Sequence, residues 1–255
     1  MEKLFIKNRK GQRIAVLVEV VKPQKGLAFI THGLGGFKEQ PHVQTYAQSF
    51  VESGYTTVLF DTTNTFGESD GNYENATVTN YYEDLEDVIS WAKSQPWYNE
   101  PFILAGSSLG GMCTILYTEK YPEKVKALAP ISTTVSGKLS MEAMPESEVT
   151  QWKESGWRVT PRTSKPGIKR LPWSHMENRV RYDVLPEAHK LNMPVLLAVG
   201  ELDDSEPLGA QQKLYEALPG KKELHIIKGA PHTFRDPKHL AEIKNILTQW
   251  IKGLD

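Results

Sequence analysis

The sequence GSSLG at residues 106–110 follows directly after the apolar run 102–105, and a helix-like segment from Met112 to Lys120 comes after it. Glycine at both ends of a G-x-S-x-G pattern lets the chain turn sharply enough to raise the middle serine to the tip of a strand, where its hydroxyl can attack a substrate. The pattern therefore predicts Ser108 as a nucleophile. The alternative interpretation is a glycine-rich turn in which the serine only caps the helix.

Two later strand-like runs, 194–199 and 223–227, are each followed by a candidate partner for this serine. A serine hydroxyl is a weak nucleophile until a base removes its proton, and a histidine does this best when a carboxylate fixes its tautomer. Asp203 follows the first run and His232 follows the second. The order serine, acid, histidine, with each residue just past a strand, predicts a catalytic triad of Ser108, Asp203 and His232.

A further apolar run, 27–31, ends in the glycine-rich sequence HGLGG at residues 32–36. Acyl transfer places negative charge on the former carbonyl oxygen, and two fixed backbone N–H groups can stabilise that charge. This loop and the residue after the serine predict the amides of Leu34 and Leu109 as the two donors. His32 is interpreted as a residue that stabilises the loop and not as a catalytic group.

Strand-like and helix-like segments alternate along the chain, which is the pattern of a mostly parallel sheet covered by helices. Apolar residues at helical spacing predict core-facing helices around 78–92 and 240–250. The first two strands are joined through a short polar turn and predict an antiparallel hairpin at one edge of the sheet. Eight strands are predicted, near 2–7, 12–21, 27–31, 55–60, 102–106, 125–130, 194–199 and 223–227.

Residues 133–186 interrupt this alternation, because they contain no long apolar strand and yet hold three tryptophans. The segment is too long for a plain loop and too apolar for a disordered linker. It predicts a cap inserted over the strand tips, with 1–132 and 187–255 forming the core domain. We expect Trp152, Trp157 and Trp173 to be candidates for contact with the substrate. The alternative is an insertion that packs away from the site.

The same segment carries a run of basic residues and has no acidic residue from 158 to 170. Such a run can bind a carboxylate on a substrate, but a solvated surface is the favoured interpretation. The basic residues are Arg158, Arg162, Lys165, Lys169 and Arg170.

The composition is that of an ordinary soluble enzyme of 255 residues, with 30 basic and 31 acidic side chains. This balance favours neither a nucleic-acid partner nor a strongly charged membrane partner. Residues 1–7 are interrupted by charges and do not read as a signal peptide, and no apolar run approaches transmembrane length. The single cysteine, Cys113, fits a reducing compartment. We expect a cytoplasmic monomer or small homo-oligomer that acts on a small molecule.

The sequence resembles the α/β-hydrolase-fold serine hydrolases over nearly its full length. Within them it resembles the small esterases of the cinnamoyl (feruloyl) esterase and monoacylglycerol-lipase-like group. The matching elements are the loop at His32, the sequence GESDG at 67–71, the turn at Ser108, and the residues Asp203 and His232. The resemblance implies a mostly parallel eight-stranded sheet flanked by helices, with a cap insertion. It also selects Asp203 over Asp204, because the family places its acid three residues after the glycine that stands at 200.

Two features depart from that group: the loop at 62–66 reads TTNTF, and the turn reads Ser-Ser-Leu where relatives place a histidine before the serine. Taken together, the predicted triad and the resemblance predict a serine carboxylesterase that acts on small to medium acyl or aryl esters. A thioesterase, an aminopeptidase or an amidase on the same triad is the nearest alternative, and a ligand-binding receptor without turnover is another. We expect no cofactor and no metal, since no His/Cys cluster has metal-ligand spacing.

Overall fold

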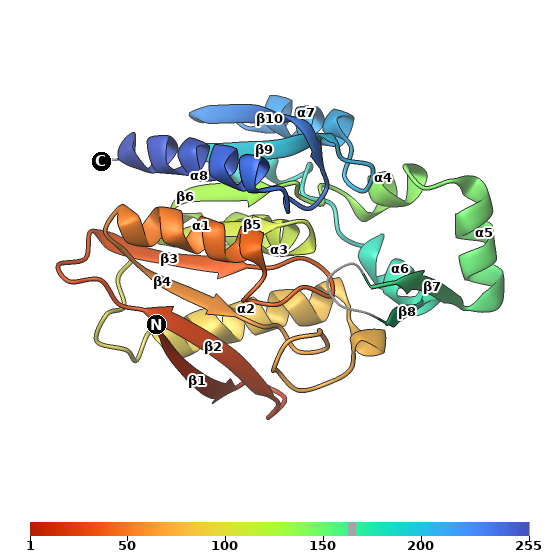
Figure 1. Cartoon of the computed structure of the whole chain (residues 1–255), viewed down its shortest axis with the longest axis horizontal. Coiled ribbons are helices and arrows are strands. Elements are labelled where there is room, and N and C mark those ends of the chain that lie inside the picture. The colour runs from red at the N-terminus through yellow and green to blue at the C-terminus, as the bar shows by residue number, and fades with distance from the viewer. Residues whose placement is uncertain (163–166, 255) are drawn as a thin grey trace.

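The fold is built on one twisted sheet of eight strands in the order β1-β2-β4-β3-β5-β6-β9-β10, in a computed structural model that describes residues 1–162 and 167–254 (Figure 1). β1 pairs antiparallel with β2, and β2 with β4, whereas the remaining neighbours are parallel. All eight predicted strands and the hairpin at the edge are confirmed. The strands are β1 (Glu2–Lys7), β2 (Arg13–Glu19), β3 (Gly26–Thr31), β4 (Tyr55–Phe60), β5 (Phe102–Ser107), β6 (Val125–Ile131), β9 (Val195–Leu202) and β10 (Lys222–Pro231).

Helices cover both faces of the sheet because the central strands are apolar on both faces. In β3, Leu27 and Phe29 belong to one buried cluster, while Ala28 and Ile30 belong to the other. The first cluster lies under α2 (Val78–Ala92), α3 (Leu109–Lys120) and α7 (Leu208–Ala217); the second lies under α1 (Pro41–Glu52) and α8 (Pro237–Lys252). The described residues also form short 3₁₀ turns between these elements: η1 (Tyr73–Asn75), η2 (Pro122–Lys124) and η3 (Ala188–Lys190).

The segment 133–186, called the insertion below, lies beyond the arrowheads of the central strands (Figure 1). It contains a two-stranded antiparallel hairpin, β7 with β8, that the sequence reading did not predict. Its Trp152, Leu171 and Met176 form a small buried cluster with Tyr73 of the core. Lys165 of the basic run lies outside the described residues. The elements of the insertion are α4 (Gly137–Glu142), α5 (Glu146–Ser155), β7 (Trp157–Pro161), β8 (Ile168–Pro172) and α6 (Trp173–Arg179).

No helix in the described part of the chain combines the length and the apolar character that a membrane crossing requires.

Candidate active site

Ser108 stands at the junction of β5 and α3 with φ of 52°, in the left-handed region that residues with side chains rarely adopt. The two flanking glycines are required by close packing. A Cβ atom at position 106 would lie 2.1 Å from Thr31 Oγ1, and one at position 110 would lie 2.3 Å from the carbonyl oxygen of His32. The strained backbone is thus held between packed neighbours, and the Ser108 hydroxyl lies within hydrogen-bond distance of His232.

Ser108, His232 and Asp203 are brought together by the parallel strands that precede them. Ser108 Oγ lies 3.0 Å from His232 Nε2, and His232 Nδ1 lies 2.9 Å from each oxygen of Asp203. The Asp203 carboxylate is fully buried. When Nδ1–H donates to this carboxylate, Nε2 is left as an acceptor for the serine hydroxyl. The arrangement is therefore that of a serine activated by an oriented histidine.

The two adjacent aspartates differ clearly in surroundings. Asp203 Oδ1 also accepts the backbone N–H of Ser205 at 3.1 Å and of Glu206 at 2.8 Å. Asp204 is exposed and accepts only the hydroxyl of Ser205. Asp203 is thus the carboxylate that is both fixed and directed at His232.

The glycine-rich loop that follows β3, residues 32–36, is held by His32, which is fully buried. The backbone N–H of Thr62 donates to His32 Nε2 at 3.1 Å, so the ring proton resides on Nδ1 and is donated to the Gly33 carbonyl at 2.8 Å. Burial lowers the pKa of His32, which favours this neutral form. The Gly36 N–H donates to the same carbonyl at 2.9 Å. In the trans peptide between Gly33 and Leu34, the Leu34 N–H points opposite to the Gly33 carbonyl. It is therefore turned away from His32 Nδ1 and from the Gly36 N–H, which both donate to that carbonyl.

The predicted oxyanion donors lie next to the nucleophile. A side chain added at Gly33 would meet Ser108 Cβ at 3.0 Å, so the Gly33–Leu34 peptide is adjacent to the serine. The Leu34 N–H donates none of the hydrogen bonds formed among the described residues. Leu109 is the first residue of α3, where an N–H has no partner within the helix. The amides of Leu34 and Leu109 therefore remain the predicted oxyanion donors.

A buried lysine next to this loop was not predicted from the sequence. Lys38 is completely buried, and its ammonium lies 2.9 Å from Asp61, 2.8 Å from Glu68 and 2.8 Å from Glu39. Burial alone would lower the pKa of Lys38, but the three carboxylates raise it above its usual value. The signal that could have found it is Asp61, a lone carboxylate directly after an apolar strand.

A second buried ion pair joins the insertion to the acid loop. The Glu206 carboxylate accepts hydrogen bonds from Arg179 of α6, from Thr134 Oγ1 at 2.6 Å and from Ser140 Oγ at 3.0 Å. Burial raises the pKa of Glu206, and the Arg179 guanidinium opposes that rise. The backbone N–H of Glu206 donates to Asp203. Glu206 therefore connects α6 and α4, through its carboxylate, with the candidate catalytic acid, through its backbone N–H.

We expect Arg179→Met to lower the free energy of unfolding by about 3–5 kcal/mol, since it leaves the Glu206 carboxylate buried without its cation. The double variant Arg179→Met/Glu206→Gln should lose less, because it removes the buried charge as well. Lys244→Met, which breaks the exposed pair with Glu52, is the matched control and should cost about 0–1 kcal/mol. Urea unfolding measures all three. A loss from Arg179→Met as small as that of the control would contradict the interpretation.

The three tryptophans of the insertion occupy different places. Trp152 is buried, donates its indole N–H to the Leu171 carbonyl at 3.0 Å, and packs edge-on against Trp173. Trp173 is partly buried in the cluster that also contacts Leu34 of the oxyanion loop. Trp157 contacts Arg170, at 4.5 Å from the ring centroid.

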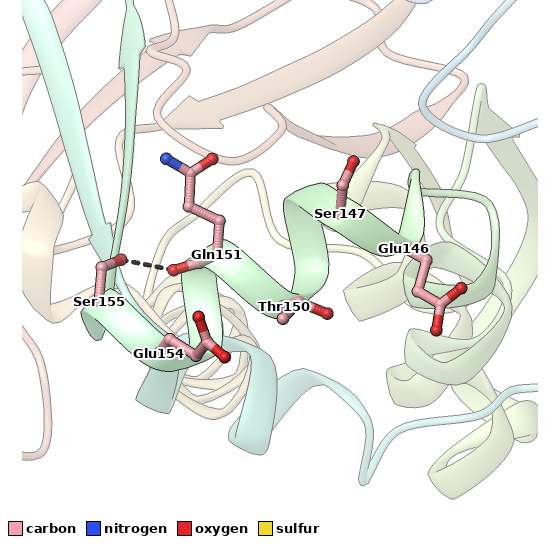
Figure 2. Close-up of a pocket in the computed structure, with 6 residues that line it drawn as sticks. All are labelled: Glu146, Ser147, Thr150, Gln151, Glu154 and Ser155. Carbon is pink, nitrogen blue, oxygen red and sulfur yellow. Dashed lines mark hydrogen bonds between the residues drawn. The ribbon is translucent and has the colours of Figure 1, made fainter.

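Two hollows lie on the insertion. The larger, of about 570 Å³, follows α5 and is lined only by that helix, as Figure 2 shows; no residue of the candidate site faces it. The second, of about 500 Å³, lies between the insertion and the core; its lining includes Phe66, Tyr73 and Glu74 of the core and Lys169 and Arg170 of β8. Among the described residues no three His, Cys, Asp or Glu side chains are grouped so that they could hold a metal ion.

The sheet order and the strand–turn–helix at Ser108 define a hydrolase of the α/β-hydrolase fold. Two solved structures agree: Est1E from Butyrivibrio proteoclasticus with ferulic acid bound (TM-score 0.83, 20% identity, 98% of each chain) and mouse alpha/beta hydrolase domain-containing protein 10 (TM-score 0.81, 23% identity, 100% of each chain). The model of the X-Pro dipeptidyl-peptidase (S15) family, a family of serine hydrolases, matches residues 32–177, more than half of the chain. The chain belongs to this family.

Two relatives are also similar to this chain in sequence. The chain is similar to an Escherichia coli protein described as an uncharacterized 31.7 kDa protein in the traX-finO intergenic region, with 26% identity over 89% of this chain and 90% of that protein. It is also similar to the mouse (Mus musculus) mitochondrial palmitoyl-protein thioesterase ABHD10, with 30% identity over 63% of this chain. That match spans about half the length of the thioesterase (53%).

Proposed function

We propose that this protein is a serine esterase that hydrolyses small to medium acyl or aryl esters through an acyl-enzyme intermediate. The observation that carries the proposal is the continuous hydrogen-bond chain from Ser108 Oγ through His232 to the buried Asp203. A serine, a histidine and a carboxylate in this order and at these distances provide a nucleophile, a general base and an orienting anion.

The proposed reaction has two steps. His232 Nε2 accepts the Ser108 proton as Oγ attacks the ester carbonyl carbon, and the N–H groups of Leu34 and Leu109 stabilise the oxyanion. The protonated His232 then donates to the leaving alcohol, and the acyl-enzyme forms. Water enters and is deprotonated by His232, the acyl–Oγ bond breaks, and the carboxylic acid leaves with Ser108 regenerated.

The test is a fluorophosphonate probe combined with a hydrolysis panel. We expect the probe to label the wild-type protein stoichiometrically at Ser108 and not to label Ser108→Ala. The panel pairs acetyl, butyryl and octanoyl esters of one alcohol with aryl esters, and the highest kcat/KM should fall on an oxygen ester. Absence of labelling, or tight ligand binding without turnover, would reject the enzyme and favour a receptor.

Thioester hydrolysis is the second candidate, because a relative with 30% identity carries the name of a thioesterase. The same nucleophile and oxyanion donors serve both reactions, so the panel includes the thioester of each acyl chain. An X-Pro dipeptidyl amide is included as well, because the family is named for that activity. Release of an N-terminal dipeptide requires recognition of a free ammonium group, whereas the one carboxylate among the described residues that line the 500 Å³ hollow, Glu74, is paired with Arg170 at 3.8 Å.

We further propose that the insertion forms part of the substrate pocket, and Trp173 tests this. Trp173→Ala should lower kcat/KM for aryl and long acyl esters by about 10-fold or more, because it removes apolar surface from the cluster against which Leu34 also packs. A minimal acetate ester should change little. Trp157→Ala is the control, since Trp157 shares a hairpin face with the exposed Val159 and Ile168. Equal losses on all esters from Trp173→Ala would instead assign Trp173 a structural role.

A further inference from the structure

The hollow of about 500 Å³ shares a wall with the oxyanion loop. Phe66 and Tyr73 stack with ring centroids 4.5 Å apart and planes within 20° of each other. A side chain at Gly35 would meet the Tyr73 ring at 2.7 Å, so the aromatic pair packs directly on the loop that carries Leu34. The flat rings offer apolar contact to a group of the substrate that extends past the reacting carbonyl.

β8 adds Ile168, Lys169 and Arg170 to the lining of this hollow, and the core adds the carboxylate of Glu74. Lys169 pairs with Thr160 in the hairpin and lies on the same face as the buried Leu171, so its stem is directed toward the molecule. Arg170 lies 3.8 Å from Glu74 and is thereby paired. Within residues 1–162 and 167–254, no carboxylate lies within ion-pair distance of Lys169.

Other cations surround the same ammonium group. Burial lowers the pKa of Lys169, and the positive charges of Arg158 and Arg235 lower it further. Arg235 stands three residues after His232, so one of the two arginines whose charge acts on Lys169 belongs to the loop of the candidate catalytic histidine. Arg158 is paired with Glu148 at 3.2 Å, but Lys169 and the exposed Arg235 have no such partner among the described residues. A partly buried ammonium in a positive field is stabilised by an anion that binds beside it.

We propose that Lys169 binds a carboxylate of the substrate while Phe66 and Tyr73 contact its apolar part, so that this site prefers anionic esters. The inference deepens the proposed esterase function and rests on it. It assigns the basic run of the insertion a binding role, where the sequence alone favoured a solvated surface. The charge-assisted hydrogen bond from the ammonium to a carboxylate oxygen would appear mainly in KM, because it forms equally in the ground state and in the transition state.

Pairs of esters that differ only in charge test the proposal. On the acyl side, 4-nitrophenyl hydrogen glutarate is compared with its neutral methyl ester; on the alcohol side, 4-carboxyphenyl acetate is compared with its methyl ester. Lys169→Met keeps the aliphatic stem and should lower kcat/KM about 10- to 100-fold for the charged member of at least one pair. The neutral members should change less than about 2-fold, and the pair that responds tells whether the anion belongs to the acid or the alcohol.

Controls separate charge from structure. Lys169→Arg should retain most of the preference, and Lys153→Met on the exposed face of α5 should leave it unchanged. Added NaCl should reduce the wild-type preference, because salt screens an accessible ion pair. Equal losses on charged and neutral esters would overturn the proposal, as would no loss on either.

Direct binding keeps the inference testable if no ester is turned over at all. Isothermal titration compares 3-phenylpropionate with the neutral 3-phenylpropionamide on the wild-type protein and on Lys169→Met. We expect the wild-type protein to bind the acid about 10-fold or more tightly than the amide. In Lys169→Met this difference in affinity should disappear. Equal affinities in the wild type would reject the anion site, whereas failure of hydrolysis alone rejects only the esterase proposal.

Discussion

Ser108→Ala is expected to lower kcat by about 10⁶ and to abolish labelling by a fluorophosphonate. The reason is geometric as well as chemical: Ser108 Oγ is the hydroxyl placed 3.0 Å from His232 Nε2. Without it, no covalent intermediate can form, and only binding and the oxyanion donors remain. Initial rates on the best ester of the panel, together with circular dichroism to verify folding, measure the effect.

Ser107→Ala is the matched control, because it removes a hydroxyl one residue earlier in the same turn. Ser107 is buried at the end of β5 and forms no hydrogen bond with His232. Its activity should remain within about 10-fold of wild type. Full activity in Ser108→Ala, or its loss in Ser107→Ala alone, would show that the nucleophile is misassigned.

Asp203→Asn should lower kcat by about 10⁴ while leaving the protein folded. An asparagine that presents its NH₂ group to His232 Nδ1 stabilises the tautomer with its proton on Nε2, and that tautomer cannot accept the serine proton. Both Asp203 oxygens lie 2.9 Å from Nδ1, so either orientation of the carboxylate serves in the wild type. Steady-state rates, with a fluorophosphonate labelling time course, measure the loss.

Asp204→Asn provides the comparison at the neighbouring position. Asp204 is exposed and contacts only Ser205, so its replacement should change kcat less than 10-fold. The reverse ranking of the two variants would move the acid to Asp204 and would require a different loop conformation in solution.

The sheet could be predicted from sequence because its signals are local. The run 102–105 is buried on both faces of β5, and the glycines at 106 and 110 mark the sharp turn from strand to helix. Positions just past the strands then place Ser108, Asp203 and His232 near one another without knowledge of any side-chain contact. Strand ends were less accurate: β10 extends to Pro231, four residues beyond the predicted end.

What the sequence did not reveal depends on pairs that are distant along the chain. Lys38 forms an ion pair with Asp61, and Arg179 forms one with Glu206. Neither pair produces a periodic pattern of residue types in the sequence. The β7–β8 hairpin was missed because its strands are short and carry arginine and lysine in place of an apolar alternation. The compartment and the oligomeric state stay predictions.

The contact between Arg179 and Glu206 bears on how this enzyme could diversify. Insertions over the strand tips look like interchangeable modules. Here, however, α6 supplies the cation that pairs with the Glu206 carboxylate, and the backbone N–H of Glu206 donates to Asp203. A chimera that receives another insertion without an arginine at this place would inherit an unpaired buried anion beside its acid loop. Recombination of substrate pockets on this core would therefore succeed when Thr134, α4 and α6 are kept and the exchange is restricted to α5 and the β7–β8 hairpin between the two helices.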